Sequence, residues 1–191
     1  MTQPDDEPGA SAFVLDQFPR GRPDDDRPAY RRSPVVQALR VSDFRLFEAA
    51  LDGETDAAAE IGIGDRVDLE APFIERARRI DYDDLSGGGQ SELEYAVAAI
   101  VEADEERFVD HFNEAQPITL RLHQLDLLPG IGKKLRNSIL DERKRQPFES
   151  FEELEDRVDG LHDAGETLVE RILEELREED LKYRSFVRRE E

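Results

Sequence analysis

The sequence predicts an α+β protein in which a group of short β-strands precedes a group of helices. Up to residue 85 the apolar residues occur in short runs between Pro and Gly residues, a pattern typical of strands and turns. From residue 90 onward they recur at helical spacing. Residues 86–89 (SGGG) separate the two patterns, and we interpret them as a flexible joint between two domains.

The N-terminal domain is predicted to be a small β-barrel. The expected strands are residues 12–18, 35–41, 44–50, 66–70 and 74–82, with a long arginine-rich loop after the first. Five short strands with glycines at the bends indicate a barrel like the oligonucleotide-binding (OB) fold, which would span residues 12–85. Residues 1–11 are acidic and rich in proline, so we expect them to form a disordered tail.

The C-terminal domain, residues 90–187, is predicted to be entirely helical. Helices are expected around residues 93–101, 108–112, 118–127, 133–145, 152–158 and 167–176. In the third of these helices, Leu120, Leu122 and Leu125 are expected to face inward.

A basic segment stands out from the acidic chain. The formal net charge of the whole protein is -21, whereas residues 118–147 hold seven Lys or Arg and three acidic residues, a net charge of +4. Within this segment the sequence LLPGIGKK places two glycines immediately before a predicted helix. Cationic side chains and the free amides at a helix N-terminus both attract anions, so this segment is the predicted phosphate-binding site.

Each residue type in this segment suits that role. Pro129 ends the preceding helix, Gly130 and Gly132 allow backbone angles and close approaches that a side chain would prevent, and Ile131 can point back between the helices. The amides that follow would then donate hydrogen bonds to a phosphate at the positive end of the helix dipole. The predicted nucleic-acid-binding residues of the segment are Gly130, Ile131, Gly132, Lys133, Lys134 and Arg136.

This segment resembles the helix-hairpin-helix motifs of nucleic-acid-binding proteins, with the motif at residues 118–146. The sequence PFESFEEL at residues 147–154 is similar to the connector that links two such hairpins in tandem forms. A degenerate second hairpin follows at residues 150–177, in which His162 replaces the second glycine and Asp159 and Asp163 add negative charge. We expect the second hairpin to pack against the first without binding phosphate.

The chain as a whole resembles an uncharacterised archaeal family, domain of unknown function 655, whose members are described as predicted RNA-binding or nucleotide-binding proteins. The similar segments are FVLDQFP (13–19), PDD (23–25), YDDL (82–85), FNEAQPITLRL (112–122), residues 125–134 and KYRSFV (182–187). The resemblance implies an OB-like barrel followed by tandem hairpins. Through the family's gene neighbourhood it also implies a role near translation or ribosomal RNA, with ribosomal components as partners. It implies no catalytic activity.

The barrel domain offers a second set of cations. Arg31, Arg32, Arg78 and Arg79 could line a nucleic-acid groove, and Tyr30 and Tyr82 are nearby rings on which bases could stack. The alternative is that these arginines pair with the acidic residues around them, and the sequence leaves both readings open.

The acidic composition has two interpretations. It is typical of proteins from salt-loving organisms, because high ionic strength screens the repulsion between surface carboxylates. Alternatively, the acidic surface docks on a basic partner, which would make the protein an adaptor on the ribosome or on RNA polymerase.

Several other function classes lack support in the sequence. There is no cysteine, no Walker loop and no nucleophile elbow, and the three histidines lack the spacing of a helical zinc pair. No long apolar run or signal peptide occurs. We therefore expect a cytoplasmic, non-enzymatic protein without a metal, a cofactor or a membrane partner. Its expected ligand is nucleic acid, with RNA favoured and a DNA-binding protein as the alternative.

Overall fold

The computed structural model describes residues 9–188, so most of the predicted acidic tail lies outside the described residues. The chain separates into two compact units, and the division falls between Ala96 and Val97, inside a helix. The first unit contains the residues before this division together with the segment from Phe186 onward. The second unit spans Val97–Ser185.

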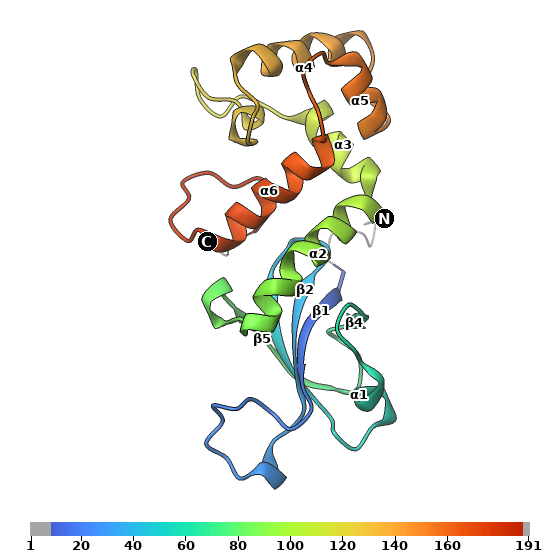
Figure 1. The fold of residues 1–191 in the computed structure, drawn as a ribbon, viewed down its shortest axis with the longest axis vertical. Helices are drawn as coiled ribbons and strands as arrows, with labels where there is room; N and C mark the ends of the chain where they lie inside the picture. Colours follow the sequence, from blue (N-terminus) through green and yellow to red (C-terminus); the bar gives the residue numbers. More distant parts are fainter. Residues whose placement is uncertain (1–8, 189–191) are drawn as a thin grey trace, which may run out of the picture. The chain divides into compact units, whose positions relative to one another are not determined.

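The first unit is built on a curled, five-stranded antiparallel sheet that forms a half-barrel (Figure 1). The strands are β1 (Ser11–Phe18), β2 (Val35–Arg40), β3 (Leu46–Leu51), β4 (Arg66–Asp68) and β5 (Ile74–Ile80). They lie in the order β4-β1-β2-β3-β5. All five strands predicted from the sequence are therefore present, with small differences at their ends. The short helix α1 (Asp56–Glu60) was not predicted.

One face of this sheet packs a small apolar core. Ala12 and Val14 of β1, Val36 and Ala38 of β2, and Ala49 of β3 are buried there, together with Leu51, Val67 and Leu69. These residues alternate along the strands because successive side chains of a strand point to opposite faces of the sheet.

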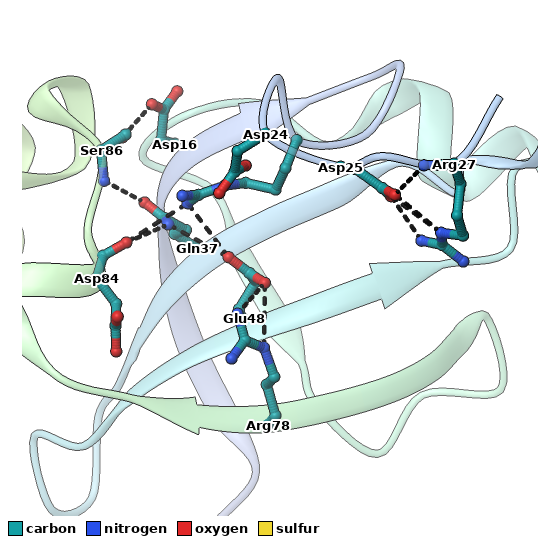
Figure 2. A network of polar contacts seen from close by, with 10 residues as sticks. Asp16, Asp24, Asp25, Arg27, Gln37, Glu48, Arg78, Asp84 and Ser86 are labelled. Carbon is teal, nitrogen blue, oxygen red and sulfur yellow. Dashed lines mark hydrogen bonds and ion pairs between the residues drawn. The ribbon is translucent and has the colours of Figure 1, made fainter. Parts of the chain in front are cut away.

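The other face carries a row of polar side chains across four strands. Asp16 is paired with Gln37, Gln37 with Glu48, and Glu48 with Arg78, in the registers of β1–β2, β2–β3 and β3–β5. Figure 2 shows the contacts between them, which include a 2.7 Å ion pair from Arg78 to Glu48. The Gln37 amide nitrogen also donates to the carbonyl of Asp84 at 3.1 Å. The segment that follows β5 therefore lies against this row.

Residues 86–89 are not the flexible joint that their composition predicts. Gly87–Gly89 form the first turn of α2 (Gly87–Ala103), and the Ser86 hydroxyl accepts the Gly89 amide at 2.9 Å. A Cβ atom on Gly88 would lie 2.8 Å from an oxygen of Asp16. Small residues stand here because the helix start approaches the sheet closely, so the glycines serve packing rather than flexibility.

The second unit contains the end of α2 and four further helices. They are α3 (Glu105–Glu114), α4 (Lys133–Arg145), α5 (Phe151–Arg157) and α6 (Ala164–Arg177). Three 3-10 helices also occur in the described chain: η1 (Ala29–Arg31), η2 (Tyr82–Asp84) and η3 (Gln124–Leu127). The core of the second unit includes Phe108, Phe112, Ile139, Leu154 and Leu168, all almost fully buried. Among the described helices, none has the length and apolar character needed to cross a membrane.

The helix predicted at residues 118–127 is wrong. The structure has a tight loop followed by the short η3, because polar side chains there bind backbone amides that a helix would need. The Thr119 hydroxyl accepts the amides of Arg121 and Leu122 at 3.2 and 3.1 Å, and His123 Nδ1 accepts the Leu125 amide at 3.1 Å. Leu120, predicted to face inward, is fully exposed.

Candidate nucleic-acid interface

The turn between η3 and α4 contains two glycines, and one of them has a backbone conformation that favours glycine. Gly130 has a φ of 77°, in the left-handed region that favours glycine. Leu128 and Ile131 are buried on either side of it. Burial is what we expect of Ile131 if it holds the turn closed. Gly130 and Gly132 themselves are exposed, so within its unit the turn lies on the surface.

Gly132 is the N-cap of α4, and neither its conformation nor its neighbours require glycine. Its φ of -92° and ψ of -177° are extended and open to any residue. A Cβ atom there would meet nothing within 4 Å. A side chain at this position would therefore obstruct only what approaches from outside. Glycine leaves space in front of the helix N-terminus.

The amides at this N-terminus are open within the described part of the chain. Gly132 provides no side-chain cap, and the amides of Lys133, Lys134 and Leu135 have no acceptor among residues 9–188. The first helical bond is the one from the Arg136 amide to the Gly132 carbonyl, at 2.9 Å. Free amides at the start of a 13-residue helix form a site for an anion.

The next two helices differ, because carboxylates occupy their N-termini. The Phe151 amide of α5 donates to Glu105 at 2.7 Å, and the Ala164 amide of α6 donates to Glu155 at 2.7 Å. Gly160, before α6, has a φ of 87°, close to that of Gly130. The second turn thus shares the left-handed glycine of the first, although its N-cap Asp163 is left-handed, with a φ of 50°, where Gly132 is extended. The start of α6 binds a protein carboxylate, whereas the start of α4 binds none among residues 9–188.

A groove of about 650 Å³ lies beside the open N-terminus. One wall is α4, through Lys133, Arg136, Asn137 and Leu140, and the other is the loop at residues 117–123 together with Asp126. The loop is braced by a bridge between Pro117 and His123 and by the bond from the Ile118 amide to the Leu122 carbonyl, at 2.8 Å. The groove therefore has a defined shape next to the free amides.

Five of the seven cations of the basic segment fall into two groups, whereas Lys144 and Arg145 are exposed and pair with Asp141 and Glu142 of the same helix. Arg121, Lys133 and Lys134 are exposed and have no ion-pair partner among the described residues. By contrast, Arg136 pairs with Asp126 at 2.8 Å and joins α4 to η3 across the turn. Arg143 donates to the carbonyls of Phe112 and Ala115, and burial lowers its pKa. The first group is available to an external anion, whereas Arg136 and Arg143 stabilise the fold.

Sequence reasoning missed His123 and Asp126 as parts of this site. The His123 side chain is only 6% exposed and lines the groove. Its Nδ1 atom accepts the Leu125 amide, while Asp126 accepts the His123 amide at 2.8 Å. Burial, more than the nearby Arg143 guanidinium, lowers the pKa of His123. The carboxylate three residues after a capping residue is the signal that could have revealed this turn.

The chain matches the model of a family described as a protein of unknown function (DUF655) over residues 9–188. It belongs to this family. DUF655 proteins similar to this chain come from archaea. An uncharacterised protein of Methanocaldococcus jannaschii, MJ0038, is 41% identical over 151 residues. The alignment covers 77% of this chain and 65% of that protein, so it leaves about a third of the relative unmatched.

A crystal structure of another DUF655 protein, Af1531 from Archaeoglobus fulgidus, is similar to this chain throughout. The sequence identity is 38% and the TM-score is 0.82, and the match covers 94% of this chain and 99% of the Archaeoglobus protein. The fold described above is therefore shared within DUF655.

The four arginines predicted as a barrel site in this DUF655 protein have different surroundings. Arg31 is exposed in the loop between β1 and β2, 5.6 Å from the ring of the exposed Tyr30. Arg32 donates to the carbonyl of Arg27 at 2.7 Å, and Arg78 is paired with Glu48. Arg79 is exposed on the edge strand β5. Arg31 and Arg79 are thus available for binding, and Arg78 is held in the polar row.

Proposed function

We propose that this protein binds nucleic acid in the cytoplasm, RNA in preference to DNA, and that it does so without catalysing a reaction. In this proposal a backbone phosphate binds the free amides at the start of α4, and Lys133 and Lys134 add positive charge beside it. Contacts to phosphate carry no sequence information, so selectivity would come from elsewhere in the interface.

The observation that carries the proposal is the open N-terminus of α4. Gly132 leaves space that the fold itself does not require, and the amides behind it have no acceptor among residues 9–188. Lys133 and Lys134 at the start of α4 and Arg121 in the groove wall have no ion-pair partner among residues 9–188, on a chain of net charge -21. General surface acidity does not account for cations grouped beside free amides. A phosphate site uses both the free amides and the cations.

Two structural features support the assignment of nucleic-acid-binding folds. The paired turns at Gly130 and Gly160, each with a positive φ, agree with tandem helix-hairpin-helix motifs in which the second is closed by Glu155. The five-stranded half-barrel agrees with an OB-like fold. OB folds bind ligands on strands 2–3 and on the loops beside them. Here residues 84–89 lie against the polar row, so Arg31 and Tyr30 in the β1–β2 loop are the proposed barrel contacts.

The test is a comparison of two charge reversals in the same helix. Binding of fluorescently labelled RNA and duplex DNA would be measured by anisotropy for the wild type and for Lys133→Glu with Lys134→Glu. The matched control, Lys144→Glu with Arg145→Glu, makes the same charge change at the other end of α4. Both control residues are exposed, with side-chain accessibilities of 75% and 77%.

We expect the first double variant to lose at least about tenfold in affinity and to show a shallower salt dependence, because it removes two phosphate-neutralising cations. The control should lose less than about threefold. Equal affinity of the wild type and the Lys133/Lys134 variant would show that the turn is not the site. If the organism is halophilic, as the composition suggests, the series must extend to high salt, where counterion release weakens phosphate contacts.

A role as an acidic adaptor makes a different prediction. Such a protein would capture ribosomal components from a lysate even after nuclease treatment, and neither charge reversal in α4 would reduce the capture. For the proposed RNA-binding role near translation, crosslinking in cells should recover RNA from the wild type and much less from the Lys133/Lys134 variant.

A further inference from the structure

The groove beside α4 has more room and more chemistry than a phosphate needs. Its volume of about 650 Å³ lies in the range of pockets that hold whole small molecules, whereas a phosphate on a helix N-terminus needs only the amides. Lys133 lines the groove at the end where the free amides begin. A nucleotide whose phosphate binds these amides would therefore extend along the groove wall.

Leu120 gives the groove an exposed apolar surface. It is fully exposed, although most large apolar residues of the described chain are buried. Its loop is rigidly braced, since the Thr119 amide donates to the Leu122 carbonyl at 3.0 Å and the Gln116 amide donates to Gln124 Oε1 at 2.7 Å. The loop thus holds an apolar side chain in water beside Arg121. An aromatic base attached to an anionic backbone matches this combination of apolar surface and positive charge.

His123 supplies a polar group inside the groove. Because Nδ1 accepts the Leu125 amide, the neutral ring carries its proton on Nε2. The His123 side chain lines the groove, and its Nε2 atom has no hydrogen-bond partner among residues 9–188 but stays accessible to solvent in the groove. A ligand atom that accepts from this Nε2–H would replace water there with a directed hydrogen bond. Asn137 adds an exposed amide on the opposite wall.

We infer that the groove takes one unpaired base of single-stranded RNA, whose phosphate binds the start of α4, with Leu120 against the base and the His123 Nε2–H bonded to its edge. This inference rests on the proposed function and deepens it, because it sets a preference for single strands. In a duplex the base edges are paired and the faces stacked, so neither contact could form.

The experiment uses a short single-stranded RNA with 2-aminopurine at its centre, and the duplex formed with its complement. The fluorescence of 2-aminopurine rises when the base leaves its stack, so it reports the predicted contact directly. Three variants would be compared with the wild type: Leu120→Ala, His123→Asn and Ile63→Ala. Asparagine at position 123 keeps an acceptor for the Leu125 amide and removes the Nε2–H donor. Ile63, 49% exposed in the other unit, is the matched apolar control.

We expect the wild type to bind the single strand more tightly than the duplex and to raise the 2-aminopurine fluorescence. Leu120→Ala and His123→Asn should each weaken single-strand binding by about fivefold, reduce the fluorescence change and leave duplex binding unaltered. Their effect should not change with salt, unlike that of the Lys133/Lys134 variant, because neither residue neutralises a phosphate. Ile63→Ala should behave as the wild type.

The outcomes separate the two proposals. If the wild type binds RNA but Leu120→Ala and His123→Asn bind it equally well with the same fluorescence, the base-binding groove is wrong and the phosphate site stands. If the wild type binds neither RNA nor DNA at any salt concentration, the proposed function is wrong and the groove inference falls with it. Thermal melting of each variant would confirm that it is folded.

Discussion

The Ser86 hydroxyl donates a hydrogen bond to the Asp16 carboxylate at 2.5 Å, across a sequence separation of 70 residues. The same hydroxyl accepts the Gly89 amide, and the Ser86 amide donates to Gln37 Oε1 at 2.9 Å. The start of α2 is therefore held to β1 and β2 by a single residue. This relationship explains why the chain has glycine at residues 88 and 89, where an added Cβ would lie 2.8 Å from Asp16 and 3.0 Å from Gln37, and it leads to the first prediction.

Gly88→Ala should lower the free energy of unfolding by about 1–2 kcal/mol, although alanine usually favours a helix. The added methyl would lie 2.8 Å from the Asp16 oxygen that binds Ser86, so the carboxylate must move and the bond must lengthen. Gly87→Ala is the matched control, because its Cβ would meet nothing within 4 Å. It should be neutral or stabilising by a few tenths of a kcal/mol in urea denaturation. Equal effects of the two substitutions would contradict this account of the glycines.

Gly132→Ser should make the protein more stable and its RNA binding weaker. Serine is a favourable N-cap, and the extended backbone of Gly132 suits it, so the free energy of unfolding should rise by a few tenths of a kcal/mol. Its hydroxyl would also take one of the free amides, so RNA affinity should fall several-fold in the anisotropy assay. A variant that binds RNA as well as the wild type would argue against the amides as the site.

Gly130→Ala should lower the free energy of unfolding, whereas Gly132→Ser should raise it. An alanine with a φ near 77° is strained, so we expect a loss of about 1 kcal/mol in the free energy of unfolding. Gly160→Ala, with a φ of 87° in the second turn, should cost a similar amount. RNA binding should then survive in the Gly160 variant under conditions where both variants remain folded, since the second turn is closed by Glu155.

Arg136 should matter more for stability than for phosphate binding. In a double-mutant cycle, Arg136→Ala and Asp126→Ala should show a coupling free energy of about 1 kcal/mol, because both side chains are largely shielded from solvent. The pair Lys144 and Asp141, whose side chains are 75% and 78% accessible and lie 3.9 Å apart, should show almost none. A coupling near zero for both pairs would remove the structural role that we assign to Arg136.

Stability should fall in acid through His111. Burial lowers the pKa of this residue from 6.5 to about 4, so the folded state keeps it neutral while the unfolded state takes up a proton. The stabilisation is complete above pH 6.5 and is lost as the pH falls toward 4, by up to about 3 kcal/mol. The burial of His123 acts in the same direction.

The check is the urea unfolding free energy of the wild type and His111→Leu between pH 7 and pH 4. The variant should have a shallower slope in this range, whereas His162→Leu, which alters an exposed ring, should keep the wild-type slope. If the unfolding free energies of the wild type and His111→Leu fall equally with pH, other groups cause the acid sensitivity.

Local sequence determined much of this protein, because the signals lie within a few residues. Short apolar runs between Pro and Gly residues predicted the five strands, and helical spacing predicted α4 at its observed bounds. Glycine at position 130 permits the left-handed conformation that the structure shows there. The basic segment within the acidic chain contains the turn at Gly130 and Gly132, and the structure places this turn on the surface of its unit.

Tertiary structure decided the features that depend on contacts between distant residues. The sequence SGGG looked like a joint, and only the approach of Asp16 shows it to be a packed helix start. The leucines at residues 118–127 suggested a helix, but hydrogen bonds from Thr119 and His123 form a braced loop with Leu120 in solvent. Composition also could not show which arginines are paired with carboxylates. Whether a guanidinium is free or paired depends on which carboxylate the fold places within about 3 Å, as for Arg78 beside Glu48.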